Sequence, residues 1–358
     1  MRAESRASAS RRCGPRRSTL RKVRVSILIT LCVLASACGK PGPALAGATD
    51  LGALMNPNAP TLWRDGGSSV LLGTQLLWAF GDTIFPFQAD DGSQLRTNTA
   101  ALAAPAAPLT LTEPLDGRGA PYQFVPFTAD ESASNNTLPT GERIALWPGA
   151  MIATDPLHAL VFVDKLIVLP GVLNYQEVST ELAQASSGST QATRLGTLFA
   201  APEPQFNHGA VAKDSVLYLY SCETSGDCRV ARASLAAATQ RPAYQFWTGA
   251  SWSSDISLAA LDVPGSTAGF SVAWNDALGE YVSASTPGFS SQLLLRTAPA
   301  PEGPWSNPTT AWNAPSEIYA VYQHPELELA NGRTIRISYS RQVSGFAGEI
   351  RLVEINFR

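Results

Sequence analysis

Residues 63–83 read WRDGGSSVLLGTQLLWAFGDT. A polar and aromatic opening leads into an apolar hairpin from Leu71 to Phe80, and the hairpin ends in Gly-Asp-Thr. The same order of opening, turn and apolar strand returns at Trp147, Asn207, Phe270 and Tyr322, at intervals of roughly 50 to 85 residues. Five copies at this spacing predict a propeller of five blades, whose openings meet around one central channel.

Short apolar runs of strand length fill the rest of the chain, and helical periodicity is scarce. We therefore predict an all-β fold, a single-domain five-bladed β-propeller that spans residues 50–358. The stretch from about 105 to 141 is rich in Pro, Thr, Ser and Asn, which favours a long loop over one face.

The N-terminus resembles an export signal. Residues 1–24 hold nine of the 26 basic residues, and the apolar run 25–37 has 13 residues, fewer than the roughly 20 that a membrane span needs. We expect a lipoprotein-type signal peptide over 1–37 with Cys38 lipidated, then a flexible tether over 38–49. Cleavage after Ala44-Leu45-Ala46 is the alternative and would give a soluble secreted protein. In the lipidated form, the membrane is contacted only through the anchor.

The charge of the exported chain bounds its partners. Removal of residues 1–37 leaves 17 Lys and Arg against 28 Asp and Glu, a formal charge of −11. An acidic surface repels phosphate polymers, so we expect no nucleic-acid partner. A carbohydrate polymer without charge fits better, and we expect a monomer.

Two cysteines remain beyond residue 38. Cys222 and Cys228 face an oxidising compartment after export, and a turn-rich segment separates them. We predict one structural disulfide, Cys222–Cys228, closing a hairpin tip.

Carboxylates at the predicted blade openings are the candidates for chemistry. Asp65 follows Arg64 in the first opening, and Asp82 ends the next strand, which returns to the same end of the hairpin. Two close carboxylates are typical of glycosidases. Glu326, in the opening Tyr-Gln-His-Pro-Glu, is the predicted acid, because neighbouring carboxylates and low dielectric would raise its pKa. Asp65 is the predicted base or nucleophile, and Asp82 its partner.

Other polar and aromatic side chains at the openings suit sugar hydroxyls and ring faces. Glu223, at the end of a strand in the third blade, is an alternative acid. Purely structural roles for these residues stay open: the aspartates could cap turns, the histidine could be a core residue, and Glu326 could pair with Arg336. The predicted substrate-binding residues are Arg64, Trp147, His208, Trp274, Asn275, His324 and Arg336.

The chain lacks the sequence motifs that serine hydrolases, zinc proteases and nucleotide-binding proteins need. The chain has three histidines, no Gly-x-Ser-x-Gly and no His-Glu-x-x-His, and it lacks a phosphate-binding glycine loop. We expect no cofactor and no metal; the run Asp90-Asp91-Gly92 favours a turn over a calcium site.

Four phrases carry a family resemblance: 64–68 (RDGGS), 80–83 (FGDT), 296–306 (RTA with GPWS) and 324–340 (HPEL with ISYS). With them, the chain resembles the exported bacterial family called domain of unknown function 4185. That family is similar to the five-bladed propellers of arabinanase-like and invertase-like glycoside hydrolases. The resemblance implies a furanose polymer such as arabinan and acid–base chemistry by channel carboxylates. Related propellers place an acidic residue where this chain has Asn207-His208, which leaves the general acid open.

These observations predict an exported glycoside-hydrolase-like propeller that acts on a neutral polysaccharide. The alternative is a non-catalytic carbohydrate-binding or cell-surface interaction lipoprotein on the same scaffold, because a fold does not fix a function.

Overall fold

The computed structural model describes residues 39–358 except 172 and 346. The expected signal peptide and lipidated Cys38 lie outside the described residues. Residues 39–358 form one compact unit that is mostly β-sheet. No helix in this described part has the length and apolarity that a membrane crossing requires.

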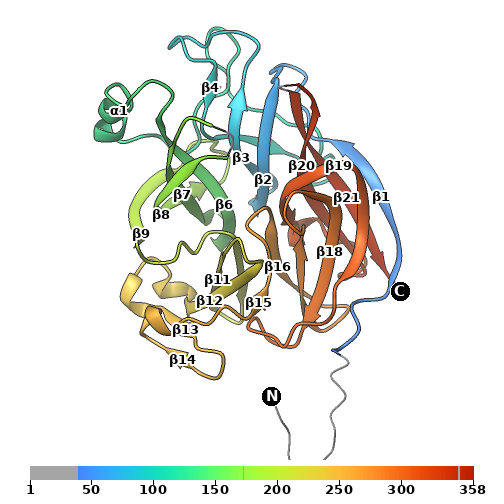
Figure 1. Ribbon diagram of the computed structural model, residues 1–358. Helices are drawn as coiled ribbons and strands as arrows, with labels where there is room; N and C mark the ends of the chain where they lie inside the picture. The colour runs from blue at the N-terminus through green and yellow to red at the C-terminus, as the bar shows by residue number, and fades with distance from the viewer. Residues whose placement is uncertain (1–38, 172, 346) are drawn as a thin grey trace, which may run out of the picture. The chain divides into compact units, whose positions relative to one another are not determined.

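The described strands form five consecutive antiparallel groups, the blades of a propeller (Figure 1). Blade one holds β2 (Trp63–Leu72), β3 (Gln75–Ile84), β4 (Leu95–Arg96) and β5 (Thr99–Ala103). Blade two holds β6 (Arg143–Asp155), β7 (His158–Val168), β8 (Tyr175–Ser186) and β9 (Thr193–Ala200). Blade three holds β10 (Gly209–Lys213), β11 (Val216–Cys222), β12 (Asp227–Ser234), β13 (Gln245–Trp247), β14 (Trp252–Ser253) and β15 (Val263–Pro264).

Blades four and five share one long strand. Blade four holds β16 (Phe270–Asn275), β17 (Glu280–Ser285), β18 (Ser290–Ala298) and the first half of β19 (Thr309–Gln323). The second half of β19 begins blade five, which continues with β20 (Thr334–Ser344) and β21 (Ala347–Phe357). This sharing joins the two blades into one seven-stranded sheet within the described residues.

The propeller closes on itself in two ways. The first strands of the blades, β2, β6, β10, β16 and β19, contact one another in this order, and β19 contacts β2. The N-terminal strand β1 (Leu45–Ala53) pairs with β21 as the outer strand of blade five, so the two ends of the unit lie side by side (Figure 1). Apolar clusters fill the spaces between adjacent blades; the cluster of Val70, Leu77, Leu146 and Val161, for example, joins blades one and two.

The structure differs from the expectation in one segment and adds a detail to another. Residues 45–49 of the expected tether belong to β1, because Leu45 and Ala48 pack on the core of blades four and five. The expected loop 105–141 contains a helix, α1 (Ala129–Asn135), which begins with a capping box between Thr128 and Glu131. Four short 3₁₀ helices complete the described elements: η1 (Leu235–Ala237), η2 (Arg241–Ala243), η3 (Ile256–Leu258) and η4 (Pro325–Leu327).

Candidate active site

Asp65 and Asp82 lie side by side at one end of the channel. The strands β2 and β3 run antiparallel with Arg64 opposite Thr83, so the start of one strand meets the end of the other. Gly66 takes a φ of +82° at an irregularity in the pairing, and an added Cβ there would lie 2.8 Å from the backbone N of Gly81. Glycine is therefore required for this close approach of β2 to β3.

The Asp65 carboxylate accepts hydrogen bonds from Trp63 Nε1 at 3.2 Å and from the Tyr319 hydroxyl at 3.0 Å. The backbone N–H of Asp82 donates a third. Despite these bonds, burial and then the charge of Asp82 raise the pKa of Asp65 to about 7. Asp65 is therefore close to half protonated at neutral pH.

Arg143 and Trp147 hold the Asp82 carboxyl group beside Asp65. Arg143 Nη2 donates to Asp82 Oδ2 at 2.6 Å, and Trp147 Nε1 donates to Oδ1 at 3.1 Å. Burial raises the pKa of Asp82, and the Arg143 charge opposes that rise. Trp147, expected as a stacking platform, thus also orients a carboxylate.

The sequence analysis missed a third buried carboxyl group, Asp164. Asp164 lies opposite Trp147 in the β6–β7 pairing. Burial and the charge of Glu177 raise the pKa of Asp164 to about 8, although Asn207 hydrogen-bonds with its carboxyl group. Its Oδ1 is buried without a protein partner. The sequence held a signal for this site, because Asp164 is a charged residue inside the apolar run 159–169. Asp164 lies on the second strand of its blade, as Asp82 does on its own.

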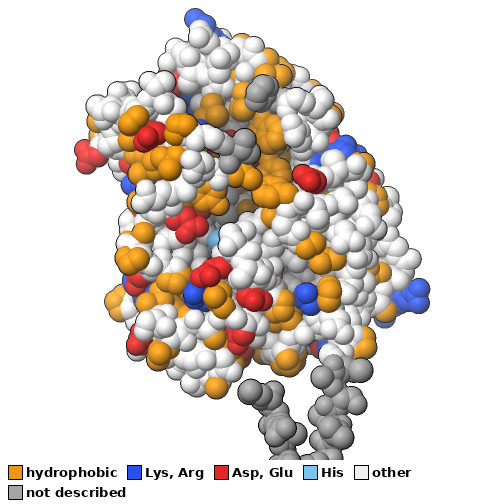
Figure 2. All heavy atoms as spheres, in the orientation of Figure 1, with side chains coloured by type: hydrophobic (Ala, Val, Ile, Leu, Met, Phe, Trp, Pro, Cys, Tyr) orange, Lys and Arg blue, Asp and Glu red, His pale blue; other side chains and the backbone are white. Residues whose placement is uncertain are grey.

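Tyrosines tie these carboxyl groups into one cluster. Burial and the charges of Asp65 and Asp164 raise the pKa of Tyr322, which therefore lies near both. Glu223 raises the pKa of Glu177, after burial, and Glu177 in turn acts on Asp164. We call Asp65, Asp82, Asp164, Glu177 and Glu223 the acidic mouth. Acidic side chains and a histidine gather around a hollow in the face shown in Figure 2.

His208 reaches the acidic mouth as a neutral side chain. Its Nδ1 accepts a hydrogen bond from the backbone N–H of Cys222 at 3.3 Å, and burial lowers its pKa to about 4. His208, Trp147, Asp164, Tyr319 and Tyr322 line a cavity of about 160 Å³. The cavity combines aromatic walls with carboxyl groups, as expected of a carbohydrate site.

Glu326 lies away from the acidic mouth, so the predicted pairing of Glu326 as acid with Asp65 as base is not what the structure shows. Its carboxylate contacts the hydroxyl of Ser69, four residues beyond Asp65 on β2, or on the order of 13 Å along the strand. Glycosidase carboxyl pairs are about 5 to 9.5 Å apart. Blade five begins within β19, six residues before His324. The residues 322–326, which were expected to open this blade, therefore lie at the end of its first strand.

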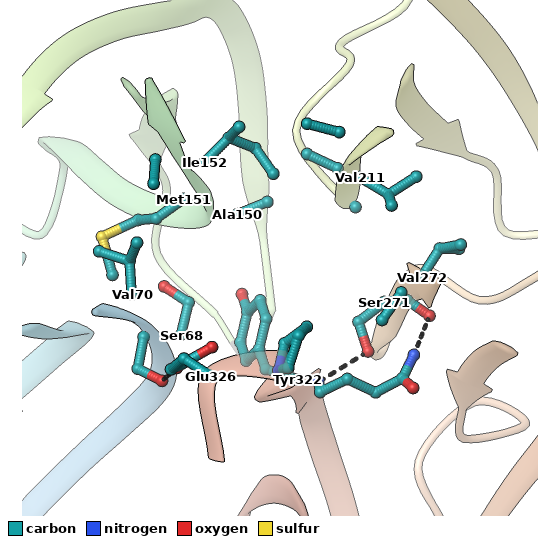
Figure 3. A pocket seen from close by; sticks show the side chains of 18 of the residues that line it. Ser68, Val70, Ala150, Met151, Ile152, Val211, Ser271, Val272, Tyr322 and Glu326 are labelled. Atoms are coloured by element: carbon teal, nitrogen blue, oxygen red, sulfur yellow. Dashed lines mark hydrogen bonds between the residues drawn. The ribbon is translucent and has the colours of Figure 1, made fainter. Parts of the chain in front are cut away.

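Glu326 instead lines a cavity of about 460 Å³ (Figure 3), which we call the far cavity. The contact of Glu326 with Ser69 places this cavity further along β2 from Asp65. Trp274 lines this cavity too, and Asn275 is buried and accepts from the backbone N–H of Leu278. His324 is fully buried against Trp78 at 4.7 Å between ring centroids. These three expected substrate ligands are therefore not at the acidic mouth.

Two expected arginines have structural partners. Arg64 forms a buried salt bridge with Glu113, with Nη2 and Oε2 3.0 Å apart, and its guanidinium lies over Phe80. Arg336 pairs with Glu354 at 3.2 Å, and not with Glu326. Sequence position alone placed both near the channel, but their side chains serve packing between strands and loops.

The predicted disulfide is confirmed. Cys222 and Cys228 are joined across the β11–β12 hairpin, where they face each other in the pairing. Glu223 begins the turn between them; its side chain is 46% exposed and pairs with Arg229. In residues 39–358, apart from the two undescribed positions, no group of three His, Cys, Asp or Glu side chains is arranged to hold a metal ion.

Solved structures share this fold at low identity. A provisionally assigned hydrolase of Bacteroides ovatus matches with a TM-score of 0.61 and 15% identity, over 84% of this chain and 87% of its own. The α-L-arabinofuranosidase of Podospora anserina, in complex with cellotriose, matches with a TM-score of 0.53 and 13% identity, over 88% and 98%. An exo-β-1,3-galactanase of Phanerochaete chrysosporium, with β-1,3-galactotriose, matches with a TM-score of 0.52 and 13% identity, over 86% of this chain and 64% of its own.

Sequence comparisons give a family but no curated relative. A search of curated proteins finds no match. The family described as "Domain of unknown function (DUF4185)" matches residues 174–344. The predicted resemblance to this family is therefore confirmed over these residues, which make up less than half of the chain, and the chain shares the fold of five-bladed propeller glycoside hydrolases.

Proposed function

We propose that this protein is an exported glycoside hydrolase that cleaves a polysaccharide at the acidic mouth. One observation carries the proposal: Asp65 and Asp164 share this mouth, and burial raises the pKa of both into the neutral range. A glycosidase needs one carboxylate as base or nucleophile and one carboxylic acid that protonates the leaving oxygen.

Asp65 has the lower pKa of the two and acts as the base or nucleophile. Its three hydrogen bonds fix the carboxylate, and burial followed by the charge of Asp82 raises its basicity. Arg143 donates to Asp82, and its charge opposes the rise in the pKa of Asp82 that burial causes. The base needs no movement before it acts.

Asp164 acts as the acid. Its pKa of about 8 keeps it mostly protonated at neutral pH. The orphan Oδ1 gives the proton a free position from which to reach a substrate oxygen. Tyr322 lies near both carboxyl groups and can donate to a sugar hydroxyl between them.

The folds of an arabinofuranosidase and a galactanase support a largely neutral glycan, with a furanose polymer such as arabinan as the first candidate. The cavity of about 160 Å³ admits little more than a single sugar ring, and His208 and Trp147 bind that ring. Export, with Cys38 as lipid anchor, would place the enzyme beside extracellular polymers.

The test is a panel of arabinans, galactans and pyranose polymers, with released reducing ends measured for the exported form. We expect hydrolysis of at least one furanose polymer, and a loss of about 10²- to 10⁴-fold in Asp65→Asn and Asp164→Asn. Glu326→Gln, which changes a carboxylate in the far cavity, is expected to retain activity. Binding of a polymer without any product would favour the carbohydrate-binding alternative.

A further inference from the structure

A second cavity opens on the same face as the acidic mouth. It measures about 350 Å³ and lies between the loops of blades three and four; we call it the side pocket. One wall is the turn 223–226 of blade three, and the other comes from residues 264–267, which lead from blade three to blade four, and from residues 287–288 of blade four. Small residues dominate this lining, and Arg296 is the basic residue among them.

The walls of the side pocket are fixed in place. The Cys222–Cys228 disulfide closes the base of the turn 223–226. The backbone N–H of Gly265 donates to the carbonyl of Gly226 at 2.9 Å, which joins the two walls. An added Cβ on Gly265 would lie 2.1 Å from Cys228 Sγ, so the loop packs directly on the disulfide. A preformed pocket avoids the cost of ordering loops on binding.

Arg296 enters this pocket without an anionic partner. Its Nη1 donates to the carbonyl of Ser306 at 2.9 Å, but no carboxylate in the described residues forms a salt bridge with it. Glu223 is occupied by Arg229, and the charge of Asp227 offsets the burial of the guanidinium only in part, so the pKa of Arg296 stays lowered. A guanidinium has five N–H donors, so most of them are free for a ligand.

The side pocket adjoins the acidic mouth. Thr267 lines both cavities, and Glu223, at the edge of the side pocket, is close enough to Glu177 to raise its pKa. A glycan chain bound in the mouth would therefore place a neighbouring residue beside Arg296.

We propose that the side pocket binds the carboxylate of a uronic acid residue next to the sugar held in the acidic mouth. The proposal rests on the proposed function, and it names an acidic residue within an otherwise neutral polymer as the specificity element. The planar guanidinium fork matches a carboxylate in two parallel hydrogen bonds, a match that a neutral hydroxyl cannot make.

The net charge of the exported chain is consistent with sparse acidic residues. A formal charge of −11 opposes a polyanion along its whole length. The Debye length at physiological salt is about 8 Å, so one carboxylate at Arg296 is largely shielded from distant carboxylates. A single uronic acid can therefore be bound where a long polyuronate would be repelled.

The test measures binding of arabinotriose extended by a single galacturonic acid residue, and of the methyl ester of the same compound, by isothermal titration calorimetry, because the ester removes the one charge and keeps the rest of the ligand. We expect the protein to bind the acid at least about tenfold more tightly than the ester. Arg296→Gln should abolish this preference, and Arg296→Lys should keep part of it. Arg333→Gln, a matched change at an exposed arginine, should leave it unchanged.

Equal affinity for acid and ester, or a preference that survives in folded Arg296→Gln, would overturn the proposal. Circular dichroism checks the fold of each variant. The test does not require cleavage: a charge preference in a protein that hydrolyses no polymer contradicts only the proposed function. Hydrolysis of a neutral polymer without any preference contradicts only the side pocket.

Discussion

Gly81→Ala tests whether the position of Asp65 controls activity. Gly81 has no side chain where the Asp65 carboxylate packs, and an added Cβ would lie 2.4 Å from Asp65 Oδ1. An ordinary contact is about 3.4 Å, so the carboxyl group must move by about 1 Å. Misplacement of a reacting group by 1 Å can cost about 10²-fold in rate, or about 2.7 kcal/mol in the activation free energy.

The fold should tolerate the same change. The colliding atom is the end of a side chain, and we expect the free energy of unfolding to fall by no more than about 1 to 3 kcal/mol. The assay compares kcat/KM on the best polymer of the panel with the midpoint of urea unfolding. Gly47→Ala is the matched control, because an added Cβ there meets nothing within 4 Å. A folded Gly81→Ala protein with wild-type kcat/KM would refute the role of Asp65.

Three further predictions concern protonation. The profile of kcat/KM against pH should be bell-shaped with its maximum near pH 7.5, because activity needs Asp65 ionised above a pKa of about 7 and Asp164 protonated below about 8; a flat profile from pH 5 to 9 would contradict this assignment. Tyr319→Phe removes a hydrogen bond that lowers the pKa of Asp65, so the acidic limb should move to higher pH, and an unmoved limb would contradict the contact. Asp164→Asn should raise the free energy of unfolding more at pH 8 than at pH 4. The pKa of Asp164 is raised from 3.8 to about 8, so wild-type Asp164 lowers the stability of the fold as pH rises from the first value through the second, and asparagine does not. The gain at pH 8 is up to about 5 kcal/mol, less what solvent at the mouth screens, and equal pH dependence in both proteins would disprove it.

The blades could be predicted from the sequence because their signal is local. Apolar runs of strand length and turn residues such as Gly73 are set by neighbours in the chain, and these runs became strands. The pairing of β1 with β21 joins residues some 300 positions apart. No local pattern in Leu45–Ala53 reveals that partner, so the segment was expected to be a tether.

The site was only half predictable for a related reason. Asp65 and Asp82 belong to one hairpin, and antiparallel pairing alone brings them together. Asp164 and Tyr322 reach the same mouth only through the ring of blades. Glu326 was misplaced because strand direction decides which end of a blade faces which mouth, and its strand begins well before the phrase that was taken as the opening.

The division of roles between Asp65 and Asp164 is the central claim, and two substrates test it together. A polysaccharide has a poor leaving group that needs the acid, whereas 2,4-dinitrophenyl α-L-arabinofuranoside has a leaving group that departs without protonation. Asp164→Asn should lose hydrolysis of the polymer and keep that of the aryl glycoside, while Asp65→Asn should lose both. Wild-type rates on both substrates in both variants would contradict the account.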